Sequence, residues 1–142
     1  MIMPAFRLLD GPLPSDPPFD ISVAAGAVVT FDGRVRDHND GRGVRKLAYS
    51  AYPALALSEG ASIIAEAITK FALNAAACCH RLGDLALGDV AVRVWAAAAH
   101  RAEAFAGCRY ILDEVKARVP IWKKETYVDG QSEWVMCTHL RA

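Results

Sequence analysis

Two stretches of the chain carry apolar residues at intervals of three and four, the spacing of one face of an α-helix. The first covers residues 53–72, with apolar positions at Leu55, Ile63, Ile64, Ala67, Ile68 and Phe71. The second begins at residue 101 and extends to Pro120, and its apolar face includes Phe105, Cys108, Leu112, Val115 and Val119. Pro53 suits the first turn of a helix and Pro120 cannot continue one, so we expect one long helix to begin at Pro53 and the other to end before Pro120.

The other apolar segments are short or alternate with polar residues, which is typical of β-strands. We expect strands at residues 5–9, 26–35, 44–52, 75–81 and 90–98, and a hairpin of residues 122–128 and 133–137. Loops should cover residues 10–18, which hold four prolines, and polar residues 37–43, which should form a mobile hairpin loop. Turns at Gly83 and Gly88 should separate the middle strands. This order predicts an α+β fold, with two long helices packed on a mostly antiparallel sheet.

Length and charge narrow the class of protein. The chain has 142 residues, and we expect a single domain over residues 1–142. Its 16 basic and 16 acidic residues balance, which gives no reason to expect nucleic acid or an anionic membrane as a partner. The apolar runs are much shorter than the ~20 residues of a membrane-spanning helix. Residues 1–9 lack the basic start of a signal peptide, so we expect a cytoplasmic protein.

The cysteines offer no metal-binding pattern, because no CxxC pair occurs among Cys78, Cys79, Cys108 and Cys137. The adjacent Cys78 and Cys79 are poorly placed for chelation or for a disulfide, so buried, reduced thiols are expected. A zinc site would need His80 or His139 from distant segments. We therefore expect neither a metal nor a cofactor.

Candidate anion-binding residues occur in two places. His100 and Arg101 stand at the start of the second predicted helix, where positive side chains are unfavourable unless a negative group is near. A bound phosphate would supply that charge, and so would Glu103. Arg34 and Arg36, at the exit of the second predicted strand, could clamp the same anion or could be an exposed strand end.

Two lysines are candidates for chemistry. Lys116 closes the second predicted helix, and Lys123 follows seven residues later beyond Pro120, so both amines can face one pocket. A partly desolvated lysine among other cations has a lowered pKa and can act as an acid, a base or a nucleophile. The simpler alternative is an ordinary helix-terminal cation at Lys116 and a solvated strand at residues 123–125.

Together these segments resemble the catalytic large subunit of molybdopterin synthase. The matching elements are residues 26–36, 47–53, His80-Arg81-Leu82-Gly83, Ala99-His100-Arg101 with Ala104-Phe105, residues 116–125 and Trp134-Val135. They span residues 26–135, about four-fifths of the chain. The resemblance implies an α/β-hammerhead-like arrangement with a small additional β subdomain.

The resemblance also implies an activity, that of a sulfurtransferase in molybdenum cofactor biosynthesis. Such an enzyme installs a dithiolene on cyclic pyranopterin monophosphate to form molybdopterin. The sulfur comes from a small ubiquitin-like subunit that carries a thiocarboxylated Gly-Gly terminus. This chain ends in residues 139–142 (His-Leu-Arg-Ala), without Gly-Gly, so we expect it to receive that tail rather than to donate sulfur. The implied assembly is a homodimer at the centre of a heterotetramer.

Carried onto this sequence, the substrate pocket of the family falls on Arg34, Val35, Arg36, His100, Arg101, Lys116, Lys123, Lys124 and Glu125. The arginines and His100 would hold the substrate phosphate, and Lys116 and Lys123 would be the catalytic residues. A helix from Arg101 to Lys116 is about 22 Å long, so one small pterin cannot easily touch both of its ends. We therefore expect the two clusters to meet across a homodimer.

The chain departs from the family pattern at three places. Ser50 stands where an acidic residue is common, the segment before Gly26 is short and proline-rich, and Thr138 stands where a basic residue contributes, unless Arg141 replaces it. Two other functions are open. A module that binds a phosphorylated small molecule would not need the lysines, and a scaffold for a ubiquitin-like partner would not need the phosphate cluster. The presence of both clusters favours the enzyme.

Overall fold

A computed structural model describes residues 4–136 of the chain. Two helices lie within this range, α1 (Pro53–Phe71) and α2 (Arg101–Arg118). The strands in the same range are β1 (Phe6–Leu9), β2 (Ala27–Arg34), β3 (His38–Asn39), β4 (Arg42–Ala51), β5 (Ala75–Arg81), β6 (Gly83–Ala86), β7 (Val90–Ala98), β8 (Ile121–Tyr127) and β9 (Ser132–Met136).

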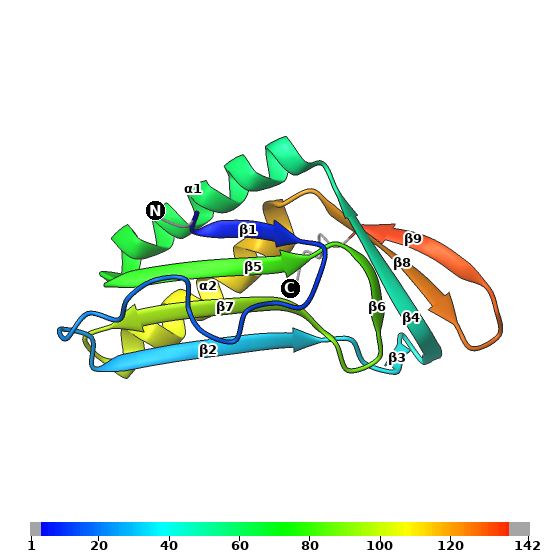
Figure 1. Cartoon of the computed structure of the whole chain (residues 1–142), viewed down its shortest axis with the longest axis horizontal. Helices are drawn as coiled ribbons and strands as arrows, with labels where there is room; N and C mark the ends of the chain where they lie inside the picture. Colours follow the sequence, from blue (N-terminus) through cyan, green and yellow to red (C-terminus); the bar gives the residue numbers. More distant parts are fainter. Residues whose placement is uncertain (1–3, 137–142) are drawn as a thin grey trace.

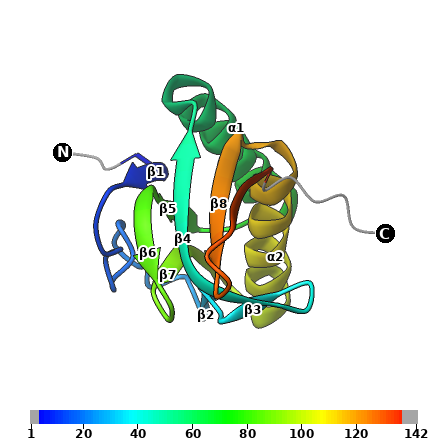
Figure 2. The ribbon, with the colours of Figure 1, turned by 90° about the vertical axis from the view of Figure 1, so that its right-hand side faces the viewer.

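The first sheet has the strand order β1-β5-β7-β2. Strands β1 and β5 run parallel, whereas β5, β7 and β2 pair antiparallel. Both helices lie on one face of this sheet (Figure 2), and the main hydrophobic core fills the space between them. On the opposite face, Leu13 of the proline-rich segment packs with Trp95 of β7 and Cys79 of β5.

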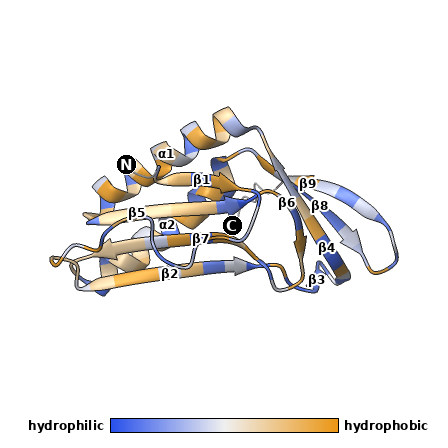
Figure 3. Cartoon of the chain, viewed as in Figure 1, coloured by the Kyte–Doolittle hydropathy of each residue, from blue (hydrophilic) through white to orange (hydrophobic). Residues whose placement is uncertain are grey.

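The second sheet is antiparallel and lies beyond one end of the first (Figure 1). Its strands follow the order β3-β4-β8-β9, and β6 also pairs with β4. Hydrophilic residues are more frequent on β8 and β9 than on β5 and β7 (Figure 3). The prediction of an α+β fold, with two long helices on a mostly antiparallel sheet and an additional β part, is therefore confirmed.

The predicted helix at residues 53–72 is α1, and Pro53 occupies its first turn. Its buried face consists of Ala56, Gly60, Ile63, Ile64 and Ala67. The prediction that Leu55 belongs to this face is wrong, because Leu55 is exposed. Small residues at positions 56 and 60 face the sheet instead and let the helix backbone approach Phe6 of β1.

The second predicted helix is α2, which ends at Arg118, just before Pro120, as predicted. Ala104, Cys108, Ile111 and Val115 form its buried face, whereas Phe105 is 61% exposed, contrary to the prediction. The short side chain of Ala104 takes the inward position next to Phe105. The backbone N–H of Val119 donates to the carbonyl of Val115 (3.0 Å) and ends the helix before the proline.

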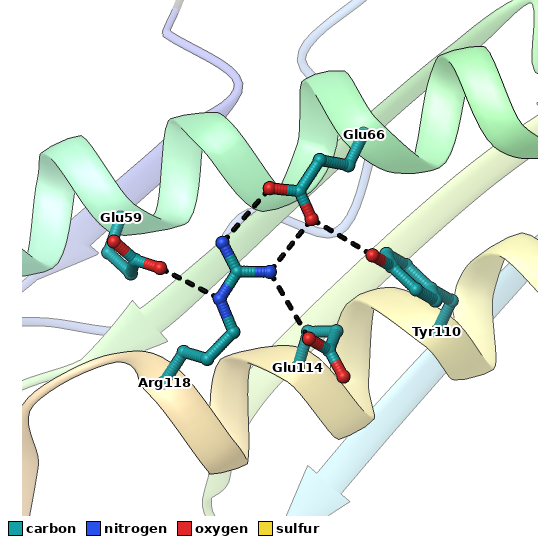
Figure 4. Close-up of polar contacts among 5 residues, drawn as sticks. All are labelled: Glu59, Glu66, Tyr110, Glu114 and Arg118. Atoms are coloured by element: carbon teal, nitrogen blue, oxygen red, sulfur yellow. Dashed lines mark hydrogen bonds and ion pairs between the residues drawn. The ribbon is translucent and has the colours of Figure 1, made fainter.

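A polar cluster joins the outer surfaces of the two helices (Figure 4). The Arg118 guanidinium donates to Glu59 (2.7 Å), to Glu66 (2.7 and 3.0 Å) and to Glu114 (3.1 Å). The Tyr110 hydroxyl also donates to Glu66 (2.9 Å). Hydrogen bonds from Arg118 and Tyr110 lower the pKa of Glu66 to about 2, so this carboxylate stays charged in mildly acidic solution.

The segment at residues 37–43 is more ordered than the predicted loop. His38 and Asn39 of β3 pair with Gly43 and Arg42, and only Asp40 and Gly41 form the turn. Both turn residues have positive φ, the geometry that suits a two-residue hairpin. Similarly, the predicted turn at Gly83 begins β6, which pairs with β4.

Three of the cysteines, Cys78, Cys79 and Cys108, are buried free thiols, as predicted. Burial raises the pKa of Cys108 to about 11 and that of Cys78 well above its usual range, so both stay protonated near neutral pH. Cys137 lies outside the described residues. Among residues 4–136, neither helix is long and apolar enough to cross a membrane.

Candidate active site

Lys116 and Lys123, the predicted catalytic residues, lie at one end of the molecule, where α2 turns into β8. Val119 and Pro120 make this connection short, and the N–H of Ile121 donates to the Val119 carbonyl (2.9 Å) as β8 begins. Both lysines line the same two neighbouring cavities, as does Arg34. The chain therefore brings the two amines to one cavity, as the sequence predicted, and places Arg34 beside them.

The larger cavity, of about 610 Å³, lies along the second sheet and the exit of β2. Its charged lining comprises five cations and three carboxylates: Arg34, Arg36, Arg42, Lys116 and Lys123 against Asp40, Glu125 and Glu133. The excess of cations suits an anionic ligand.

The register of β8 decides which of its side chains face this cavity. Lys123 pairs with Tyr49 of β4, and Glu125 pairs with Leu47. Because side chains alternate along a strand, Lys123, Glu125 and Tyr127 share the face that lines the cavity. Lys124 lies on the opposite face of β8 and does not line either cavity.

Glu125 is the most deeply buried charged group of the larger cavity, with a side chain only 4% exposed. Its Oε2 lies 3.4 Å from Nζ of Lys123. The Asn39 amide donates to both carboxylate oxygens (3.1 and 2.8 Å), and the Tyr127 hydroxyl lies 2.9 Å from Oε1. This network fixes Glu125 and places its charge beside Lys123.

The Tyr127 hydroxyl lies between two carboxylates, because it is also 2.7 Å from Oε1 of Glu133. Its hydrogen bond to Glu133, its burial and its contact with Glu125 all raise the pKa of Tyr127 above its usual range. The guanidinium of Arg42 stacks over the same ring, 3.5 Å from its centre. Tyr127 therefore stays protonated, and its hydroxyl links β8 to β9 through Glu125 and Glu133.

The exit of β2 presents the predicted arginines. Val35 is buried, and its backbone N–H donates to the Asp89 carbonyl (2.9 Å) while its carbonyl accepts from Gly88 (2.7 Å). These bonds hold the backbone that carries Arg34 and Arg36, and both side chains line the larger cavity. Val35 also lines it.

His100 and Arg101 are placed apart from the other predicted residues. His100 occupies the N-cap position of α2, without a capping hydrogen bond from its side chain, and Arg101 begins the helix, so they are one helix length away from Lys116. The rise of an α-helix makes that separation about 22 Å. Both residues are exposed, and neither lines the cavities that hold the lysines. One chain alone does not unite the two predicted clusters.

His80 belongs to the site although sequence reasoning did not assign it there. It lies in β5, is 7% exposed and lines the smaller cavity, of about 100 Å³, together with Lys116, Lys123 and Tyr49. Burial, with a contribution from the charge of Lys116, lowers the pKa of His80 to about 4. The imidazole is therefore neutral near pH 7. Its position at the end of an apolar strand was the available signal in the sequence.

The described residues contain no group of three or more His, Cys, Asp or Glu side chains arranged to hold a metal ion. Thr138, His139 and Arg141, which the sequence raised as further candidates, lie outside residues 4–136. The fold and the cavity thus define a class: an α+β protein with a cation-rich cavity that contains two lysines.

Comparison with known proteins narrows this class. Residues 17–118 match the family described as MoaE protein. A molybdopterin synthase catalytic subunit from Oryza sativa subsp. indica is 50% identical over 109 residues, which cover 77% of this chain and 56% of that protein. The chain thus spans little more than half the length of this relative. The molybdopterin synthase catalytic subunit 1 of Mycobacterium tuberculosis is 42% identical, with 93% of this chain and 90% of that protein covered.

Solved structures agree with the sequence comparisons. A molybdopterin synthase structure from Staphylococcus aureus superposes with a TM-score of 0.87 at 33% identity, covering 94% of this chain and 98% of that chain. A complex of subunits 1 and 2 of the molybdopterin-converting factor from Helicobacter pylori shares the fold, with a TM-score of 0.70 at 18% identity, covering 92% and 90%. The chain belongs to the MoaE protein family.

Proposed function

We propose that this chain is the catalytic subunit of molybdopterin synthase. It transfers sulfur from the C-terminal thiocarboxylate of a small ubiquitin-like subunit to cyclic pyranopterin monophosphate and so forms the dithiolene of molybdopterin. The observation that carries this proposal is the convergence of Lys116 and Lys123 on one cation-rich cavity. It is supported by the names of two relatives, one matched over 90% of its length and the other over 56%. The same proposal includes a cytoplasmic location for the reaction and a single domain for the chain.

The larger cavity suits a phosphorylated pterin. Its volume of about 610 Å³ lies within the ~300–1,000 Å³ of typical small-molecule sites. Arg34 and Arg36 supply guanidinium groups for the phosphate, and the backbone that carries them is fixed at Val35. Glu125 is bound to Lys123 and Asn39, so it orients the site rather than binding the anionic end of the substrate.

Lys116 and Lys123 act on the thiocarboxylate. Its sulfur attacks a substrate carbon as the bond from that carbon to a substrate oxygen breaks, and water then cleaves the acyl–sulfur bond, which leaves a carboxylate on the tail and a thiol on the substrate. Positive amines stabilise the negative charge that develops on the acyl oxygen and donate protons to the departing oxygen of the substrate. Two such transfers, from two donor tails, complete one dithiolene.

The protein partner in this proposal is the small subunit that carries the tail. The Helicobacter pylori structure is described as a complex of two subunits of the molybdopterin-converting factor, which supports a two-subunit assembly for this chain. The tail is narrow because it ends in glycines. It would therefore enter the smaller cavity, where both lysines are exposed to a ligand.

A second copy of the chain completes the site. His100 and Arg101 lie about 22 Å from Lys116 along α2, so in our proposal they bind the substrate phosphate in the cavity of the partner copy. Mixing Arg101→Ala with Lys123→Ala subunits tests this arrangement. A mixed dimer contains one site with neither substitution and should regain activity, whereas a mixture as inactive as its parents would refute the shared site.

The activity itself is tested with purified components. The chain is mixed with a thiocarboxylated small subunit and cyclic pyranopterin monophosphate, and dithiolene formation is measured. Lys123→Ala should abolish product, while Lys70→Ala, a change of an exposed lysine at the far end of α1, should leave the rate unchanged. Normal product formation by Lys123→Ala would refute the assignment of Lys123 as a catalytic residue. Substrate binding without consumption of thiocarboxylate would identify a binding module instead.

A further inference from the structure

The smaller cavity contains a buried histidine whose role the proposed sulfur transfer leaves unassigned. His80 lies at its wall, at the end of β5, and shares the cavity with Lys116 and Lys123. A buried histidine beside two amines is a costly arrangement unless the imidazole is neutral. The structure shows how that neutral form is held.

One hydrogen bond fixes the tautomer of His80. Its Nδ1 lies 2.8 Å from the backbone carbonyl oxygen of Arg81, and a carbonyl can only accept, so Nδ1 carries the proton. In a neutral ring the other nitrogen, Nε2, then has a free electron pair and acts as an acceptor. The ring packs against Tyr49 in a T-shaped arrangement, with 4.9 Å between the ring centres, which restrains its orientation.

The groups around this acceptor come from four other elements. Arg34 of β2, Lys116 of α2 and Lys123 of β8 are cationic donors, and Tyr49 of β4 is the neutral titratable group. The neighbouring carboxylate, Glu125, is engaged by Lys123 in the larger cavity. Lys116 lines the same cavity as His80, and its charge contributes to the lowered pKa of the imidazole. The imidazole therefore offers a neutral acceptor among donors, with an ammonium group nearby.

We propose that His80 is a positioning residue for the sulfur-transfer site, whose Nε2 accepts a hydrogen bond from the Lys116 ammonium and directs that amine toward the incoming thiocarboxylate. This inference rests on the proposed function. A lysine side chain has four rotatable bonds, so an acceptor of fixed direction reduces the number of positions that its amine can occupy. Because the acceptor is uncharged, it orients Lys116 without neutralising the positive charge that the anionic tail requires.

Two substitutions distinguish the roles of the two ring nitrogens of His80. His80→Gln places an amide oxygen near the position of Nε2, whereas His80→Asn places an amide N–H near Nδ1 and leaves nothing at Nε2. Single-turnover sulfur transfer is measured for both variants across pH, with folding checked by circular dichroism. We expect His80→Gln to stay within a few-fold of the unmodified chain. His80→Asn should be slower by about 10- to 100-fold, the cost of a misplaced catalytic group.

The pH profile distinguishes positioning from a structural role. An acceptor stabilises the protonated amine, so its loss in His80→Asn should move the alkaline limb of the rate profile to lower pH. A general loss of packing would slow both variants alike and leave the profile in place, which would overturn the proposal. Unchanged activity of His80→Asn would do so too.

A measurement without substrates keeps this inference separate from the proposed function. The ¹⁵N chemical shifts of the His80 ring should show a protonated Nδ1 and an unprotonated Nε2, and Lys116→Ala should change the Nε2 signal. If the unmodified chain transfers no sulfur, the proposed function fails while this signal still reports the Lys116 contact. An Nε2 signal that is insensitive to Lys116→Ala would refute the contact itself.

Discussion

The burial of His80 makes the stability of the protein depend on pH in a predictable window. Burial lowers the pKa of this histidine from 6.5 to about 4 in the folded chain. In the unfolded chain it returns to its ordinary value of about 6.5. Between these two values the unfolded state binds the proton and the folded state does not, so acid favours unfolding.

The magnitude follows from the two pKa values. Each pKa unit corresponds to ~1.36 kcal/mol of stability. The difference between 6.5 and about 4 therefore amounts to about 3 kcal/mol at a pH low enough for both states to be protonated. This contribution is negligible above about pH 7, because neither state is then protonated. Near pH 4.5, where the unfolded histidine is charged and the folded one is mostly neutral, it reaches about 2.5 kcal/mol.

Urea unfolding of the unmodified chain and of His80→Gln, near pH 7 and near pH 4.5, measures this contribution. Carboxylates with lowered pKa values, such as Asp32 and Glu66, also lose stability in acid, but they do so in both proteins and cancel in the comparison. We expect the unmodified chain to lose about 2.5 kcal/mol more than the variant. Equal losses would show that His80 is not held neutral by burial.

Three further substitutions test the packing around the site and the core. Tyr127→Phe removes the hydroxyl between two carboxylates and should lower the Tm by a few degrees in thermal unfolding; an unchanged Tm would contradict the network. Ala72→Gly relieves a left-handed residue at the end of α1 (φ 53°) and should add about 0.5 kcal/mol in urea unfolding, whereas a loss would contradict the strain. Gly60→Ala drives a methyl group into the ring of Phe6 and should cost about 1–3 kcal/mol by the same method. Gly11→Ala, whose methyl would meet no atom within 4 Å, is its control, and equal effects would refute the packing argument.

The sequence predicted the helices and the long strands because their signals are local. Periodic apolar residues and the two prolines located α1 and α2, although Leu55 and Phe105 are exposed. The helical repeat predicts which residue faces inward only to within about one position, so a small neighbour such as Ala56 can be buried in place of Leu55. Strand β6 was missed because its partner, β4, lies far away in the sequence.

The structure brings part of the predicted site together. Lys116, Lys123, Arg34 and Arg36 line one cavity, whereas His100, Arg101 and Lys124 do not. The partners of Glu125 were not found, because Asn39 is 86 positions away and Tyr127 could equally have been a core residue. His80 was missed because a lone histidine in an apolar strand is usually structural. The roles of the site residues and the single domain stay predictions.

The central claim is that this chain uses Lys116 and Lys123 to move sulfur from a donor tail to a pterin phosphate. Mass spectrometry of the small subunit, combined with quantification of dithiolene product in one reaction, tests it most directly. The account predicts that two thiocarboxylates become carboxylates for each dithiolene formed, and that Lys123→Ala forms none. Product formed without loss of thiocarboxylate, or at the same rate by Lys123→Ala, would contradict it.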